Sequence, residues 1–162
     1  DRAVFEVAVQ DCERGALGAD SVCFMFSSTG SSPVDLSKCA SGGELSRIML
    51  CLKEMMARYV GMPTMIFDEI DTGVSGSVAD KMGRMICTMG EHMQVFAITH
   101  LPQVAAKGRA HYLVSKSEDQ SGRVVSSIRL LDSESRIREI ARLLSGEVIT
   151  PAALANAREL LG

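Results

Sequence analysis

The chain has 162 residues, of which 46% are hydrophobic and 23% are charged, and its formal net charge is −3. This length and composition are typical of one globular domain, so we expect residues 1–162 to form a single domain. The small negative charge argues against a strongly basic nucleic-acid module, and no apolar run approaches the roughly 18 residues that a membrane helix needs.

The N-terminal third predicts two strands and a long helix. Val4–Val9 and Val22–Phe26 are rich in Val and Phe and are expected to be strands. A serine-rich loop follows the second strand. Apolar residues at helical spacing then predict an amphipathic helix from Gly43 to about Tyr59, and Ser41 or Gly42 is expected to cap it.

The middle of the chain predicts a βαβ unit. Thr64–Phe67 and Gln94–Thr99 are short apolar runs and are expected to be buried strands. Apolar residues at helical spacing from Val78 to Met89 predict a helix between them. Strands joined in this way are parallel, with a right-handed crossover, so their carboxyl ends are expected at the same edge of the sheet.

The C-terminal third predicts a hairpin and two helices. Tyr112–Lys116 and Val124–Leu131 are the expected strands of the hairpin. Apolar spacing predicts a helix after Ser133 or Ser135, and Pro151 is expected in the first turn of a last helix that ends at Leu161. The whole pattern predicts an α/β fold with a parallel βαβ core, a flanking hairpin and C-terminal helices.

The cysteines and the first residues indicate the setting of the chain. The five cysteines are odd in number, and no two of them stand two residues apart. Neither a disulfide framework nor a zinc site is indicated, and a reducing cytosol is the expected environment. No signal peptide is visible, and the absence of an initiating methionine suggests a piece of a longer chain.

The first candidate site is Ser41-Gly42-Gly43-Glu44, at the expected start of the long helix. Unpaired backbone N–H groups and the positive end of the helix dipole suit such a place to an anion. The two glycines would let a phosphate approach the backbone, and the serine hydroxyl can donate to it. The alternative is a plain helix cap in which Ser41 bonds the first turn.

The second candidate site is the pair Asp68 and Glu69, which follows the first strand of the βαβ unit. Adjacent residues on a strand point in opposite directions, so the two carboxylates can serve two roles. One can hold Mg²⁺, usually through water, and the other can orient or deprotonate an attacking water. The alternative is a solvated strand end that caps the next turn.

The third candidate site is His100, directly after the second strand of the unit and at the edge where α/β sheets bind ligands. It can contact a phosphate oxygen or an attacking water, or it can be structural, as we expect of His92 and His111. The three sites together are parts of a phosphoryl-transfer site. Because no G-x-x-x-x-G-K-[ST] loop is present to cradle the phosphates, the sequence holds half of an ATP site.

The order of these motifs resembles that of ABC-type ATPases. Ala40–Glu44 is similar to their signature motif, Thr64–Glu69 to their Walker B strand, Ile70–Gly73 to their D-loop and Thr99-His100 to their H-loop. In SMC-like members of this superfamily a long coiled coil divides the ATPase head, so that Walker A lies in the N-terminal half. The chain resembles the C-terminal half of such a head, without the Walker A half.

Longer segments resemble the RecN family of bacterial DNA repair proteins. The loops after Glu69 and His100 are its most specific part, and the resemblance runs from about Val22 to the end of the chain. One departure is Cys39, where an aliphatic residue is more usual. The segments that carry the resemblance are Leu36–Arg47, Phe67–Gly76, Thr99–Ala106, Ile140–Gly146 and Ala157–Leu161.

The resemblance implies roles for single residues around one bound ATP. Asp68 would help to hold Mg²⁺, Glu69 would be the catalytic base or water-orienting group, and His100 would contact the γ-phosphate. These three residues would complete an ATP site in cis with the N-terminal Walker A half of the same protein.

The resemblance also implies a homodimer of heads with ATP between them. Ser41, Gly42, Gly43 and Glu44 would reach the γ-phosphate that is bound on the partner head. Asp71 would lie at the head–head interface and couple the two sites. The complete protein would bind DNA, in the bacterial cytoplasm at the nucleoid, with no membrane involved.

The implied function is ATP binding and hydrolysis in DNA double-strand-break repair and recombination, as part of the complete protein. This chain alone is expected to be inactive, because Walker A is missing. Two alternatives stay open: the head of a chromosome-organising SMC-like ATPase, and a non-enzymatic module for dimerisation or DNA contact. A Rossmann-type dinucleotide enzyme is disfavoured, since no G-x-G-x-x-G follows a strand.

Overall fold

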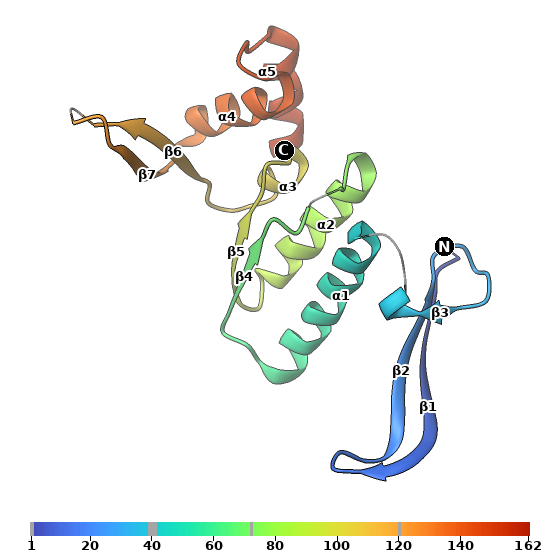
Figure 1. Cartoon of the computed structure of the whole chain (residues 1–162). Coiled ribbons are helices and arrows are strands. Elements are labelled where there is room, and N and C mark those ends of the chain that lie inside the picture. The colour runs from blue at the N-terminus through green and yellow to red at the C-terminus, as the bar shows by residue number, and fades with distance from the viewer. Residues whose placement is uncertain (1, 39–41, 72, 120) are drawn as a thin grey trace. The chain divides into compact units, whose positions relative to one another are not determined.

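The computed structural model describes residues 2–38, 42–71, 73–119 and 121–162 (Figure 1). The chain forms two compact units, Asp1–Met49 and Leu50–Gly162. Helices, a parallel strand pair and antiparallel strand pairs are all present, which confirms the predicted α/β class. Our expectation that residues 1–162 make a single domain stays a prediction.

The first unit is built on a long antiparallel hairpin. β1 (Val4–Gly15) pairs with β2 (Gly18–Ser27), and the register shifts at a bulge between Asp11 and Gly15. Both strands extend beyond their predicted ends, because the backbone ladder continues through polar residues that show no apolar alternation. β3 (Val34–Asp35) adds to β2, and a 3₁₀ turn, η1 (Leu36–Lys38), follows it.

α1 (Gly42–Val60) confirms the predicted helix within a residue at each end. Its residues from Leu50 onwards belong to the second unit, where Leu50 and Ala57 are buried. Ser41, which we expected as a possible cap, lies outside the described residues.

The second unit contains the predicted βαβ arrangement. β4 (Thr64–Asp68) and β5 (Gln94–Ile98) are parallel, in register from Thr64 opposite Gln94 to Asp68 opposite Ile98. α2 (Gly76–Met89) connects them and packs beside β5 (Figure 1). Phe67 on β4 is only 1% exposed and belongs to one apolar cluster with the buried face of α2. The other members of this cluster are Leu50, Val74, Ala79, Met82, Ile86, Met89 and Val104.

The chain continues with a short helix and a second hairpin. α3 (Pro102–Ala105) is a single turn that the sequence did not predict, because four residues carry too little periodicity. β6 (Tyr112–Glu118) and β7 (Val124–Leu130) are antiparallel and confirm the predicted hairpin.

Two helices end the chain. α4 (Ser133–Ser145) begins one residue after its cap Asp132, whose carboxylate accepts from the N–H of Ser135 at 2.7 Å. The prediction of a start after Ser133 or Ser135 was therefore wrong, since Asp132 takes the cap position and the helix already begins at Ser133. α5 (Pro151–Leu161) begins as predicted, with Thr150 as its cap.

Two general observations complete the fold. Within the described ranges, no helix combines the length and the apolar character needed to cross a bilayer. Cys12, Cys23, Cys51 and Cys87 are free thiols.

Candidate functional site

The carboxyl ends of β4 and β5 meet at one edge of the parallel pair. Asp68 is the last residue of β4 and stands opposite Ile98, the last residue of β5. The Glu69 N–H donates to the Ile98 carbonyl at 3.3 Å and so continues the ladder by one step. His100 follows two residues after Ile98. The structure therefore brings Asp68, Glu69 and His100 to the same edge, where ligands bind in α/β sheets.

Glu69 has an unusual backbone conformation. Its φ is 47°, and it is the one non-glycine residue with a positive φ in the described part of the chain. For an L-residue other than Asn or Asp this left-handed region costs about 1–2 kcal/mol. The backbone turns here directly after the strand, and the Glu69 side chain is exposed. Such local strain is typical of functional sites.

Asp71 lies at the centre of the loop contacts behind this edge. The residue is 1% exposed. The Thr99 hydroxyl donates a hydrogen bond to Asp71 Oδ2, and the Leu101 N–H donates to the same hydroxyl oxygen at 3.0 Å. The Asp71 carbonyl accepts from the N–H of Val74 at 3.1 Å. The loop after β4 is thereby tied to the loop after β5.

The second carboxylate oxygen of Asp71 has a different environment. Oδ1 is buried and, in the described structure, has no hydrogen-bond partner. It lies 3.7 Å from His100 Nδ1, and the His100 side chain is 72% exposed. Sequence reasoning missed Thr99 as a partner in this network. A threonine directly after a strand and before the histidine is the only signal that could have indicated it, and the expected burial of that strand was wrong, because β5 has no buried residue.

Asp68 has the position that a magnesium ligand needs. It is exposed at the tip of β4, so its carboxylate is open to a hydrated cation. Among the described residues, no group of three or more His, Cys, Asp and Glu side chains could hold a metal ion. Mg²⁺ bound with a nucleotide takes one or two carboxylates and completes its shell with phosphate oxygens and water. The donor set fits that mode of binding.

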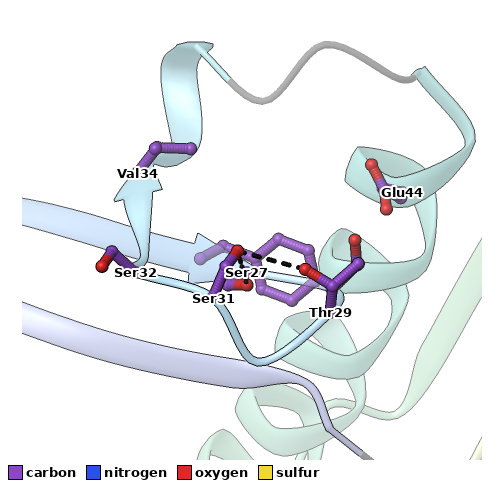
Figure 2. Close-up of a pocket in the computed structure, with 8 residues that line it drawn as sticks. Ser27, Thr29, Ser31, Ser32, Val34 and Glu44 are labelled. Carbon is purple, nitrogen blue, oxygen red and sulfur yellow. Dashed lines mark hydrogen bonds between the residues drawn. The ribbon is translucent and has the colours of Figure 1, made fainter.

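The start of α1 is described within the first unit. Gly42 begins the helix, and its carbonyl accepts from the Ser46 hydroxyl at 2.9 Å. Glu44, in the first turn, lines a hollow of about 160 Å³ with hydroxyls of the loop after β2 (Figure 2). Ser27, the last residue of β2, is buried, and its hydroxyl lies 3.1 Å from that of Ser31 in this loop. Of the first predicted site, Gly42, Gly43 and Glu44 are thus located, and Ser41 lies outside the described residues.

The corner before α1 is fixed by Asp35. Its carboxylate accepts from the Ser37 N–H at 2.8 Å and from the Ser37 hydroxyl at 2.7 Å. The Cys23 thiol also donates to it, at 3.1 Å. The hydrogen bonds from Ser37, together with that from Cys23, lower the pKa of Asp35 to about 2. Sequence analysis did not single out this corner.

The two other histidines do not follow the carboxyl end of β4 or of β5 in the sequence. His92 is exposed in the turn before β5. His111 precedes β6, and its Nδ1 is buried with no hydrogen-bond partner in the described structure. Burial lowers the pKa of His111, and the nearby Arg136 guanidinium adds to this effect.

The sequence is similar to those of bacterial DNA repair proteins. No family model matches the chain. It is 42% identical over 164 residues to the DNA repair protein RecN of Vibrio cholerae. This match covers 99% of the chain and 29% of that protein. It is 47% identical over 145 residues to RecN of Xylella fastidiosa, covering 89% of the chain and 26% of that protein. The chain thus spans less than a third of the length of these relatives.

Solved structures with a similar fold are heads of SMC proteins. The SMC head of Pyrococcus yayanosii matches with a TM-score of 0.70 at 19% identity, over 89% of this chain and 26% of that one. A second structure is described as concerning ATP-driven dimerisation and DNA-stimulated activation of SMC ATPases. It matches with a TM-score of 0.62 at 15% identity, over 88% of this chain and 84% of that one. At these identities the likeness shows the fold, which is that of part of an SMC head.

Proposed function

The chain belongs, as a segment, to the RecN family of DNA repair proteins, and on this premise we propose that it is the C-terminal part of an ATP-hydrolysing head. One observation carries the proposal: the parallel β4–β5 pair presents Asp68, Glu69 and His100 at a single edge. A carboxylate for Mg²⁺, a second carboxylate for water and a histidine are the groups that phosphoryl transfer uses at such an edge.

Each residue has its own part in this proposal. ATP with Mg²⁺ is the substrate, and the cation supplies charge neutralisation between the phosphates. Asp68 helps to hold the hydrated cation. Glu69 orients the attacking water or accepts its proton. His100 contacts the γ-phosphate, and its exposed ring is free to reach an incoming ligand.

The site is completed by an N-terminal Walker A half of the same protein. Two features support this. The relatives are more than three times as long as the chain. The face of β4–β5 that carries Ile66, Phe96 and Ile98 leaves these side chains 65%, 46% and 55% exposed, and an apolar sheet face of this kind is normally covered. Without the other half, the chain alone is expected to hydrolyse no ATP.

The first turn of α1 acts on a second molecule. Ser41, Gly42, Gly43 and Glu44 reach the γ-phosphate held by the partner head, where a helix N-terminus favours the anion. ATP then holds a homodimer together, and hydrolysis releases it. The complete protein contacts DNA during double-strand-break repair, in the bacterial cytoplasm at the nucleoid.

The test is Ser41→Arg in the complete protein. If Ser41 acts across the dimer, ATP binding to each monomer stays close to wild type in calorimetry, while steady-state turnover is lost. Gly15→Ala is the matched control, because a Cβ at Gly15 meets nothing within 4 Å. A loss of monomer ATP affinity in Ser41→Arg would overturn the assignment of this motif to the partner's nucleotide.

A further inference from the structure

Burial of the Asp71 carboxylate costs free energy, and its hydrogen bonds offset this cost only in part. Its side chain is completely buried, and burial of a carboxylate costs free energy unless its oxygens are paired by hydrogen bonds or charges. Thr99 satisfies Oδ2. Among the residues that the structure describes, Oδ1 has no hydrogen-bond partner, so one acceptor of this network is unpaired there.

His100 Nδ1 lies 3.7 Å from this acceptor. That distance is too long for a hydrogen bond, and a shift of about 1 Å would bring it into range. The His100 side chain is 72% exposed and can make this shift, whereas Asp71 is held by Thr99 and by its own burial.

We propose that Asp71 is a positioning residue for His100, and that the two close into a hydrogen bond in which the Nδ1–H of His100 donates to Asp71 Oδ1. This inference rests on the proposed ATPase function. With Nδ1–H held by Asp71, Nε2 is the ring atom left to face the γ-phosphate and the attacking water. Orientation of a histidine through its second nitrogen is a general device of catalytic sites.

Positioning of His100 is a role within one chain, and it differs from a contact of Asp71 with the partner head. At 1% exposure, the Asp71 side chain is committed within its own chain, to Thr99 and His100. The role at the head–head interface that the resemblance implies for Asp71 stays a prediction. The carboxylate itself serves the cis site, because it links the loop after the Walker B strand to the histidine that follows β5.

Asp71→Asn in the complete protein is the decisive variant. An asparagine offers one carbonyl oxygen, and the Thr99 hydroxyl takes it. The amide NH₂ then points toward His100 and donates to Nδ1, which requires the other tautomer, with the proton on Nε2. The fold is retained, because the Thr99 hydrogen bond survives.

The first readout is the ¹⁵N chemical shifts of the imidazole, in nucleotide-free protein labelled at histidine and kept at about pH 8.5, above the ordinary pKa of histidine. The His100 signals are identified by their loss in His100→Gln. We expect an Nδ1–H tautomer in the wild type and an Nε2–H tautomer in Asp71→Asn. The same tautomer in both proteins overturns the proposal.

The second readout is turnover. Asp71→Asn is expected to lower kcat by about 10²-fold with little change in ATP affinity. Asp80→Asn removes a carboxylate that faces Arg84 and Lys107, and we expect it to leave the His100 tautomer unchanged. If Asp71 only ties the loops together, Asp71→Asn keeps that tie and turnover stays at the wild-type rate, which contradicts the proposal. A tautomer change in a complete protein that hydrolyses no ATP would instead overturn the proposed function and leave the pairing intact.

Discussion

At the scale of single residues, Glu69 combines a proposed chemical role with a strained backbone. Its φ of 47° lies in the left-handed region, which glycine adopts without strain and most other residues do not. The sequence predicted a strand that ends at Asp68 and Glu69, and the structure agrees, but the expected burial of this strand was wrong, because only Phe67 of Thr64–Asp68 is buried. It could not predict the left-handed turn, because φ at this position depends on how the loop continues toward Asp71. Thr99 was missed for a similar reason, since its partner is 28 residues away in the chain.

The strain at Glu69 gives a prediction with an unusual sign. At most positions a protein with alanine has a higher free energy of unfolding than the same protein with glycine, because glycine loses more conformational entropy on folding. At Glu69 we expect Glu69→Gly to have a higher free energy of unfolding than Glu69→Ala, by about 1 kcal/mol, because alanine keeps the left-handed strain. Urea denaturation of both variants measures the difference. Ser77→Ala and Ser77→Gly, at an exposed position in α2, are the control pair and should show the normal order. An alanine advantage at Glu69 would mean that no strain is present there.

His111 gives a prediction on pH. Burial, with Arg136, lowers its pKa in the folded chain below the ordinary value of 6.5. Below that value the unfolded chain takes up a proton that the folded chain resists, so the free energy of unfolding falls as the pH drops. Above it, both states are neutral at His111 and this contribution to stability is fully present.

His111→Gln should therefore flatten the dependence of stability on pH in the range below 6.5. Thermal melts of the wild type and the variant across this range measure the effect. His92→Gln, at an exposed position, should keep the slope of the wild type. If His111→Gln retains that slope as well, the buried ring of His111 is not its source.

At the scale of elements, helical spacing predicted α1 and α2 within about two residues, Pro151 indicated the start of α5, and the parallel βαβ unit was predicted correctly. Spacing also predicted α4, but elements and helix starts that rest on side-chain hydrogen bonds were predicted less well. β3 and η1 turn around the Asp35 carboxylate, and α4 starts from Asp132. Such polar contacts leave no periodic pattern in the sequence. The predicted β1 and β2 were too short for another reason, since their backbone ladder continues through polar residues.

The contact between α2 and α3 depends on the absence of a side chain at Gly83. A Cβ at this position would lie 3.0 Å from the carbonyl oxygen of Gln103 and 3.2 Å from the Cα of Val104. Overpacking of this kind costs about 1–3 kcal/mol. We expect Gly83→Val to lower the free energy of unfolding by about 2 kcal/mol in chemical denaturation. Thr88→Val, on the exposed side of α2, should change it by less than about 0.5 kcal/mol. Equal effects of the two substitutions would contradict close packing at Gly83.

At the scale of the whole molecule, each unit has an apolar sheet face whose side chains are exposed in the described part of the chain. In the first unit the rings of Phe5 and Phe24 stack with centroids 5.9 Å apart and are 42% and 44% exposed. In the second unit the uncovered side chains are Ile66, Phe96 and Ile98. A chain that spans less than a third of its relatives is expected to bury such faces against the remainder of the protein. These exposed apolar residues therefore support the proposal that an N-terminal half of the same protein, which would carry the Walker A loop, completes the head.

ATP turnover by mixed halves tests the central claim most directly. The chain is measured alone, and then with a separately produced N-terminal Walker A half, after association of the two has been verified. We expect no turnover by the chain alone, turnover in the mixture, and loss of that turnover by at least about 10²-fold when this chain carries Glu69→Gln. Turnover by the chain alone would show that it has its own phosphate cradle. An associated mixture that hydrolyses no ATP would contradict the account and favour a non-enzymatic module.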